Sequence, residues 1–467
     1  MKLFRDFLEA NQDKKNPIST VTSMVQYPTG FLYTDYGTGS YLTVHDDDER
    51  PLYQYHNIGI PQGSVNTVIA KSQGGKTTLT VTMAAAIIEP YINELIRQAT
   101  FSDIIRHQGK KGVNFSMEGY PFIEILDTEK TLPVDYVKKV AQYTNKLVKR
   151  HILINPITTD RDLILAVDRH VKFKAAHMNK IPMPILDMFG NPIWDYPPTV
   201  LICDSSSQLL LEDCDDPNAA KKGTGIVDIY ATATQNTAGA RRAKTITALY
   251  SQLVNYAKKY NVVIFMINHI NKALPINGIP TKQYRGLRAG ETIGGGEKAI
   301  YLTANILRLD VIKSISAASP TALNLGDGVT GFVSKASWIK SKSNSKSNTS
   351  MLCYTNEAGY DPLLSCLYQG KECGDLLKSG NFHFIKGYEK LRFTLKTARE
   401  TFAEHPELCM AYYDELRDKC AVLLDNPEQA NRREQAILQE IRDDIHQEYS
   451  GSDAMDMDDM FAQMINA

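Results

Sequence analysis

The stretch that most limits how this chain can fold runs from residue 65 to residue 78. Val65 to Ile69 is a β-branched run of the kind that forms a buried strand. A glycine-containing loop follows it, and the residues after the loop place Leu79, Met83 and Ile87 at helical spacing. A strand that leads through such a loop into a helix is the context of a phosphate-binding P-loop, because amides at the start of the helix face the phosphates.

The loop matches the pattern G-x-x-x-x-G-K-[ST] with Ala70 in the place of the first glycine. That departure is mild, because bound phosphates crowd the later glycines more than the first position. A chance glycine-rich loop is the alternative, and the flanking strand and helix favour nucleotide binding over it. The expected nucleotide contacts are Ser72, Gln73, Gly74, Gly75, Lys76, Thr77 and Thr78.

A second apolar run, residues 121 to 126, ends in the acidic sequence Asp127-Thr128-Glu129. The carboxyl ends of parallel strands form the edge where α/β sheets bind their ligands. Glu129 is therefore a candidate to polarise the water that attacks a terminal phosphate. The alternative is that this acidic pair only caps the next helix, predicted from Val134 to Val148; Asp127 can serve as that cap while Glu129 does the chemistry.

A third apolar run, Thr199 to Cys203, ends at Asp204. This is the Walker B shape, in which a carboxylate at the end of a strand holds a magnesium ion that the P-loop hydroxyl also binds. Strands that end in aspartate are common, and it is the position about 120 residues after the loop that gives the pattern its weight. Thr77 and Asp204 are therefore the predicted Mg²⁺ ligands.

A fourth strand, Val262 to Ile267, ends in Asn268-His269, a polar pair that can sense the terminal phosphate. Directly behind it, residues 270 to 293 form a basic segment rich in glycine and proline, which predicts an irregular loop. Such a segment suits binding of a nucleic-acid backbone. An ordinary exposed loop is an equally supported interpretation. The candidate DNA contacts are Lys272, Lys282, Tyr284, Arg285 and Arg288.

Charge is distributed unevenly along the 467 residues. The chain carries 52 basic and 53 acidic side chains, but seven of the acids follow Arg442, where no Lys or Arg remains. The body therefore holds 46 acids (53 minus 7) against 52 bases and is mildly basic. An acidic tail behind such a body is typical of proteins whose tail competes with nucleic acid, and equally of a merely solubilising end.

Cysteine usage and apolar runs bear on the compartment. The seven cysteines include no C-x-x-C pair, which argues against a disulfide framework and a zinc ribbon. No segment approaches about 18 uninterrupted apolar residues, and the start has no apolar leader core. We therefore expect a soluble protein of the cytoplasm with no membrane partner.

Patterns in the remaining segments predict their local structure. They indicate a short helix at residues 3–10, an aromatic-rich hairpin at 31–55, a mobile polar insertion at 213–246, a hairpin at 331–350, and helices at 388–402 and 406–424.

Taken in order, these motifs resemble the RecA family of recombinases, most closely its bacteriophage UvsX type. The resemblance covers roughly residues 27 to 375. It departs from the family pattern at Ala70, in a longer hairpin before Gly59, and in an expanded region from 151 to 198. The local matches are Thr29-Gly30-Phe31, Gly59 to Gly63, Ile125 to Glu129, Ile267-Asn268-His269, and Glu357 to Cys373.

The resemblance implies a fold of the α/β class: a RecA-like P-loop ATPase core with a mostly parallel sheet, a small N-terminal extension and a C-terminal helical domain. The expected divisions are a helix and linker for oligomerisation (1–26), the ATPase core (27–375), a helical domain (376–442) and an acidic tail expected to be disordered (443–467). By the same likeness, residues around 210 to 245 hold a first DNA loop and 270 to 293 a second.

The implied activity is that of a DNA-dependent ATPase that forms helical filaments on single-stranded DNA. Such filaments pair the strand with homologous duplex DNA and exchange strands in recombination and repair, with ATP and Mg²⁺ as cofactors and single-strand-binding or loader proteins as helpers. Lys76, Glu129 and His269 take the catalytic roles. Lys340 and Lys342 correspond to lysines that reach the ATP of an adjacent subunit.

Two other functions remain open from the sequence. A ring helicase can be built on the same core, although only about 60 residues precede the P-loop and leave little for an N-terminal collar. A DNA-binding mediator that uses ATP only to assemble is the second alternative.

Overall fold

The computed structural model describes residues 25–38, 40–45, 51–107, 122–142, 151–178, 180–186, 192–211, 235–272, 287–288, 290–293, 300–319, 321–342 and 349–424. The chain divides into two units, Met1–Tyr413 and Asp414–Ala467. The second unit is described only through residue 424, at the end of helix α11 (Glu407–Leu424).

A ten-stranded sheet forms the centre of the first unit within the described residues. Its parallel part has the order β7 (Ile152–Pro156), β6 (Ile123–Asp127), β10 (Thr199–Asp204), β11 (Val262–Lys272), β5 (Val65–Ala70) and β13 (Asn305–Ile315). Three antiparallel strands continue it: β14 (Gly331–Ser341), β15 (Thr349–Thr355) and β16 (Gly359–Asp361). The short strand β12 (Glu291–Ile293) pairs with the end of β11. The predicted α/β class with a mostly parallel sheet is thus confirmed.

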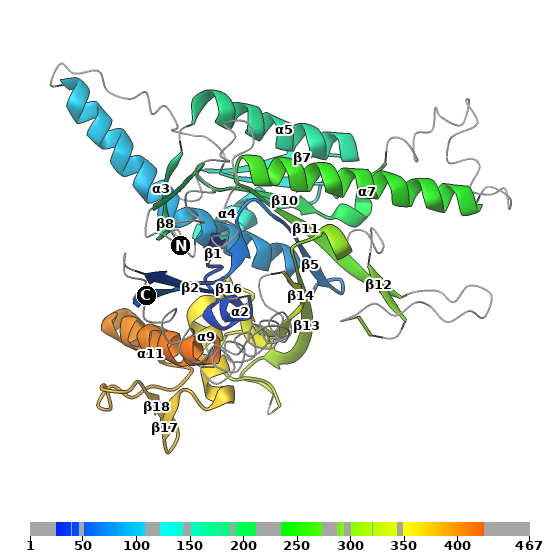
Figure 1. The fold of residues 1–467 in the computed structure, drawn as a ribbon. Helices are drawn as coiled ribbons and strands as arrows, with labels where there is room; N and C mark the ends of the chain where they lie inside the picture. Colours follow the sequence, from blue (N-terminus) through cyan, green and yellow to red (C-terminus); the bar gives the residue numbers. More distant parts are fainter. Residues whose placement is uncertain are drawn as a thin grey trace, which may run out of the picture. The chain divides into compact units, whose positions relative to one another are not determined.

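Helices cover both faces of this sheet (Figure 1). α3 (Lys76–His107) and α4 (Val134–Gln142) pack on one face, and α5 (Asp160–His177) and α7 (Gln235–Lys259) on the other. Alternate residues of a strand serve the two layers because successive side chains point to opposite faces. In β10, Val200 and Ile202 join the α3–α4 layer, while Leu201 and Cys203 join the α5–α7 layer.

The strand register brings the carboxyl ends of the parallel strands to one edge. Asp204 of β10 lies opposite Asp127 of β6, and His269 of β11 lies opposite Ala70, the last residue of β5. The polar residues that end three separate apolar runs therefore meet beside the loop that leaves β5. This edge is where a parallel sheet places its ligand site.

Smaller elements complete the described part of the chain. They are β1 (Gln26–Tyr27), α2 (Leu32–Tyr36), β2 (Ser40–His45), β3 (Pro51–Asn57), β4 (Ile60–Pro61), β8 (Ile181–Leu186), β9 (Pro192–Asp195), η2 (Ser206–Gln208), α9 (Pro362–Cys373), β17 (Leu377–Ser379), β18 (Phe382–Phe384) and α10 (Ala398–Glu404). No helix among the described residues is both long enough and apolar enough to cross a membrane.

The predicted hairpin at 31–55 is wrong in its first part, because residues 32–36 form the helix α2. The carboxylate of Asp35 accepts hydrogen bonds from the amide and the hydroxyl of Thr29, which closes the chain into a helical turn. Leu32 and Tyr36, four residues apart, are both buried. Only β2 and β3 form the antiparallel pair.

Two other expected boundaries are also corrected. Residues 235–246, expected in a mobile insertion, belong to α7, since a helix that is packed over its later turns extends readily to earlier ones. Residues 388–397 are not helical: Phe393 exchanges two backbone hydrogen bonds with His383, and α10 begins only at Ala398. The helix predicted at 406–424 and the hairpin of β14 and β15 are confirmed.

Several predictions fall outside the described residues. They concern the helix at 3–10, most of the polar insertion (213–234), the end of the helix after Gln142, and the acidic tail at 443–467. The divisions proposed at residues 26, 375 and 442 also stay predictions.

A buried lysine on α5 predicts how stability depends on pH. Lys174 donates to the carbonyl oxygens of Pro197 (2.6 Å), Tyr260 (2.9 Å) and Asn261 (3.1 Å), and burial lowers its pKa from 10.5 to about 7. Between these pKa values the unfolded chain binds more protons than the folded one, so this group makes stability rise with pH from about 7 to 10. Urea unfolding across that range should show the rise, and Lys174→Met should flatten it. An unchanged slope in the variant would contradict the assignment.

Candidate nucleotide site

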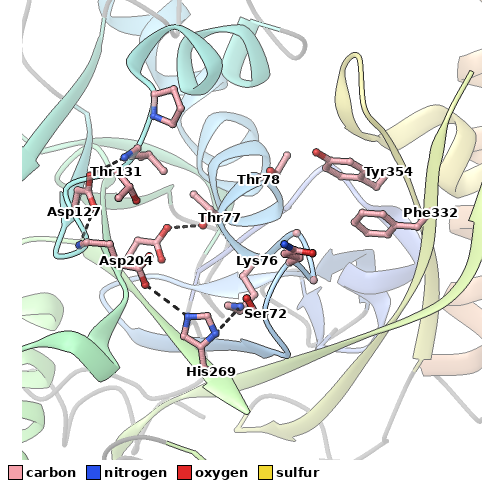
Figure 2. Close-up of a pocket in the computed structure, with 16 residues that line it drawn as sticks. Ser72, Lys76, Thr77, Thr78, Asp127, Thr131, Asp204, His269, Phe332 and Tyr354 are labelled. Atoms are coloured by element: carbon pink, nitrogen blue, oxygen red, sulfur yellow. Dashed lines mark hydrogen bonds and ion pairs between the residues drawn. The ribbon is translucent and has the colours of Figure 1, made fainter. Parts of the chain in front are cut away.

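A cavity of about 440 Å³ opens at the carboxyl edge of the sheet (Figure 2). Its wall is formed by the loop from β5, the start of α3, the loop after β6, the end of β10, His269 of β11, and strands β14 and β15. Every residue predicted to bind nucleotide, hold metal or act in catalysis lines it. These are Ser72, Gln73, Gly74, Gly75, Lys76, Thr77, Thr78, Glu129, Asp204 and His269.

The loop between β5 and α3, residues 71–75, accepts only glycine at its last two positions without movement of its neighbours. A Cβ on Gly74 would lie 2.8 Å from the Cβ of Ala70, and one on Gly75 would lie 2.7 Å from the Tyr360 hydroxyl. Gly75 also has a φ of +74°, which L side chains rarely adopt. The loop therefore forms a close-fitting cradle at the start of α3, where helix amides without intrahelical partners can bind an anion.

Lys76 extends from the first turn of α3 into this cradle and is 6% exposed. Its Nζ donates to the carbonyl of Lys71 at 3.1 Å and lies 3.3 Å from Nδ1 of His269. Burial lowers the pKa of the ammonium, and the nearby charges of Asp204 and Glu129 act in the opposite direction. A buried cation held by a carbonyl and an imidazole can exchange those partners for phosphate oxygens.

Thr77 and Asp204, the predicted metal ligands, are in direct contact. The Thr77 hydroxyl donates to Oδ2 of Asp204 at 2.5 Å. Burial raises the pKa of the Asp204 carboxyl, and the charges of Glu129 and Asp127 add to that effect, whereas Thr77 and Lys76 counter it. A hydroxyl beside a carboxylate, in a pocket with surplus negative charge, is a donor set that suits Mg²⁺.

That donor set is a partial one. Among the residues that the structure describes, no group of three or more His, Cys, Asp or Glu side chains is placed to hold a metal ion. Magnesium usually binds through one or two protein oxygens and completes its shell with water and phosphate oxygens. Thr77 and Asp204 fit that mode, and the cradle beside them leaves room for the phosphates.

Asp127 and Glu129 have different roles, and the predicted helix cap is corrected. Asp127 does not cap α4; its carboxylate accepts the amides of Glu129 (3.1 Å), Lys130 (2.8 Å) and Leu132 (3.1 Å) and shapes the loop before the helix. Thr128 ties this loop to β10 through a hydrogen bond from the Ser205 amide at 2.8 Å. The Glu129 side chain, 42% exposed, is thereby held at the cavity.

His269 lies between the two predicted catalytic groups. Its Nε2 is 3.7 Å from Oε1 of Glu129. Its Nδ1 faces Lys76 (Figure 2). Ser205 also donates to the same Glu129 oxygen at 3.3 Å. A terminal phosphate at Lys76 would therefore lie within reach of an imidazole and a carboxylate that already contact each other.

An aromatic pair that the sequence interpretation missed forms the opposite wall (Figure 2). Phe332 of β14 and Tyr354 of β15 are cross-strand partners, and their rings stack with centroids 4.4 Å apart at 10°. The Tyr354 hydroxyl lies 3.0 Å from that of Tyr136, which lies 3.0 Å from that of Thr78. A flat aromatic surface beside an anion cradle can stack a planar base. Only the strand register could have revealed this pair.

The predicted DNA contacts are only partly described. Lys282, Tyr284 and Arg285 lie outside the described residues, and Lys272 is described only in its backbone, at the end of β11. Arg288 is on the surface, and its Nη2 lies 3.3 Å from Asp310. The prediction of an irregular loop is wrong at the two ends of the segment. Residues 270–272 and 291–293 pair as antiparallel strands.

The two lysines predicted to reach a neighbouring subunit differ in their surroundings. Lys340 donates to the carbonyls of Ile300 (2.5 Å), Tyr301 (2.8 Å) and Thr303 (2.6 Å) of its own chain. Burial lowers its pKa to about 8, and the charge of Lys342 adds to that effect. Lys342 is exposed. A contact from either to another subunit stays a prediction.

No protein-family model matches this chain, and no curated protein matches it in sequence.

Proposed function

We propose that this protein is an ATP-dependent DNA recombinase of the RecA type, which forms filaments on single-stranded DNA and exchanges strands with homologous duplex. One observation carries the proposal: a single cavity gathers the glycine cradle, Lys76, the Thr77–Asp204 pair, Glu129 and His269. The strand that carries His269 continues directly into residues 270–272. These pair with residues 291–293, so the two ends of the basic segment are joined.

In this proposal the residues of the cavity divide the work of ATP hydrolysis. The amides of the glycine loop and Lys76 bind the phosphates, and Glu129 orients or deprotonates the attacking water. Thr77 and Asp204 hold Mg²⁺, which neutralises charge on the phosphates. His269, in contact with both Lys76 and Glu129, senses the terminal phosphate and relays its presence along β11.

The aromatic pair supports a nucleotide with a base rather than a simple phosphate. Tyr354→Ala should therefore weaken ATP binding by about 1–3 kcal/mol, roughly 5- to 150-fold, because it removes the stacking surface. Inorganic tripolyphosphate, which has no base, should bind the variant and the wild type alike. Titration calorimetry measures both ligands, with Phe382→Ala, an exposed aromatic of β18, as the matched control. Equal losses for both ligands would contradict a base-binding role.

The DNA part of the proposal rests on the basic segment behind β11. Its predicted contacts are Lys272, Lys282, Tyr284, Arg285 and Arg288, and its partners are single-stranded DNA, homologous duplex and further copies of this chain. Binding of a polyanion through such side chains releases counterions and depends steeply on salt. ATP at the cavity would favour the DNA-binding state of the segment, and hydrolysis would release it.

Electron microscopy combined with a strand-exchange assay tests this function. With single-stranded DNA and a slowly hydrolysed ATP analogue, the full-length protein should form open helical filaments, and with ATP it should produce joint molecules. Closed rings that unwind a forked duplex would establish the helicase alternative instead. Filaments that never yield joint molecules would identify an ATP-assembled mediator.

A further inference from the structure

The two paired ends of the basic segment lie in a gap in the central sheet. β5 ends at Ala70, and beyond this point its neighbours β11 and β13 continue without it. Residues 270–272 of β11 and 291–293 of β12 form a two-stranded ribbon that begins one residue after His269. The outgoing strand of the ribbon is thus continuous with the nucleotide site, whereas the return strand needs a separate attachment.

An ionic network supplies that attachment from β13. Arg308, paired in register with Ile69 of β5, has a side chain that is only 4% exposed. Its Nη1 and Nη2 donate to the two oxygens of Glu291 at 2.5 and 3.0 Å. Its Nε and Nη2 donate to the two oxygens of Asp310 at 2.8 and 3.1 Å. The bidentate pair with Glu291 therefore joins the first residue of the return strand to β13, and the pair with Asp310, a residue of β13 itself, holds the guanidinium in place.

The two carboxylates also contact Arg288. Oε2 of Glu291 accepts the Arg288 amide at 2.9 Å, and Oδ2 of Asp310 lies 3.3 Å from the Arg288 guanidinium. The Arg288 side chain is 65% exposed, unlike that of Arg308. Arg288 can therefore turn to a phosphate while both carboxylates keep their hydrogen bonds to Arg308.

An apolar cluster lies beside the network. Ile293, the last residue of the return strand, and Leu287, four residues before its start, pack with Ile69 of β5 and Ile306 of β13. Ile270, the first residue of the ribbon's outgoing strand, packs against the same cluster. The apolar cluster thus holds both strands of the ribbon, whereas the ion pair with Arg308 holds the return strand alone. Both attachments end on β5, which leads into the glycine loop, or on its neighbour β13.

We propose that Arg308 is a positioning residue, which fixes the return strand of the basic segment to the nucleotide-binding sheet so that DNA bound to the segment acts on His269. This inference rests on the proposed function and adds a residue to the coupling between the nucleotide site and bound DNA. With the return strand anchored, a displacement of the segment is transmitted through β11. Without the anchor, the whole ribbon moves and His269 keeps its place.

Chemistry explains why this position requires arginine. Only the planar guanidinium presents enough donors in fixed directions for two carboxylates at once. Lysine carries the same charge but offers a single point of contact, so Arg308→Lys should retain part of the attachment. Arg308→Gln removes the charge and leaves Glu291 without its ionic partner.

The test compares four full-length variants with the wild type: Arg308→Gln, Arg308→Lys, Arg308→Gln/Glu291→Gln, and the control Arg169→Gln. Arg169 contacts Glu124 of the same sheet, on the side away from the ribbon. In Arg308→Gln, the amides of residues 291–293 should exchange with solvent about tenfold faster, and stimulation of ATP hydrolysis by oligothymidylate should fall about tenfold. ATP affinity should stay within about twofold of wild type. Arg308→Lys should give exchange rates and DNA stimulation between those of Arg308→Gln and the wild type. Arg169→Gln should match the wild type in both.

The double variant separates positioning from stability. It leaves no unpaired charge at Glu291, and Asp310 keeps Arg288 at 3.3 Å, so its melting temperature should recover while DNA stimulation stays low. Recovery of both together would make Arg308 merely structural and overturn the proposal, as would unchanged exchange of residues 291–293 in Arg308→Gln. If the wild type hydrolyses no ATP, the proposed function fails, and the exchange of this strand alone then decides whether Arg308 anchors it.

Discussion

Lys76→Ala is expected to lower the rate of ATP hydrolysis by about 10³-fold or more, because it removes the one cation that lies inside the glycine cradle among the described residues of the cavity. Phosphate release under saturating ATP measures the effect. Lys71→Ala is the matched control: its side chain is exposed in the same loop, and only its backbone carbonyl contacts Lys76. That control should hydrolyse ATP at nearly the wild-type rate.

The physical basis of this expectation is the burial of Lys76. An ammonium that has already lost its water is weakly compensated by one carbonyl and one imidazole, and burial lowers its pKa accordingly. Phosphate oxygens offer it full charges in the same low-dielectric space, where they interact strongly. Wild-type hydrolysis by Lys76→Ala would remove the cradle from the catalytic site.

Glu129→Gln is expected to separate binding from chemistry. The amide keeps the size and polarity of the side chain but can no longer accept a proton, so hydrolysis should fall by about 10²- to 10⁴-fold. ATP affinity should change little, since the cradle and Lys76 are untouched. Single-turnover hydrolysis and equilibrium binding, measured on the same preparation, distinguish the two effects.

Glu357→Gln provides the control for this variant. Glu357 is an exposed carboxylate between β15 and β16, outside the residues that line the cavity. It should hydrolyse ATP normally. Normal hydrolysis by Glu129→Gln itself would assign the base to another residue.

The sequence predicted the sheet edge well because the signal there is local. Each strand ends where an apolar run meets a polar residue, and parallel strands bring such ends together without any knowledge of their order. Asp127, Asp204 and His269 therefore reach one cavity as expected. The glycine loop could be predicted equally well, because glycines stand where a Cβ would come too close to neighbouring atoms.

Features that depend on strand register could not be predicted in the same way. Phe332 and Tyr354 stack only because the hairpin pairs them directly across its strands. Arg308 meets Glu291 only because β12 returns into the gap beyond β5. Such contacts join residues distant in sequence, and no pattern within either segment indicates the other.

Helix α2 illustrates a different limit. Its residues belong to an aromatic-rich stretch, and aromatic residues are enriched in strands, so a hairpin was predicted. The hydrogen bonds from Thr29 to the buried Asp35 decide otherwise, and burial raises the pKa of that carboxyl to about 7. Tertiary burial of Leu32 and Tyr36 thus outweighs local propensity.

The most direct measurement is the affinity of the full-length protein for fluorescent oligothymidylate in three nucleotide states. If the cavity edge at His269 controls the basic segment, anisotropy titrations should show tight binding with a slowly hydrolysed ATP analogue and binding at least about tenfold weaker with ADP or with no nucleotide. Equal affinity in all three states would contradict the coupling on which the proposed function depends.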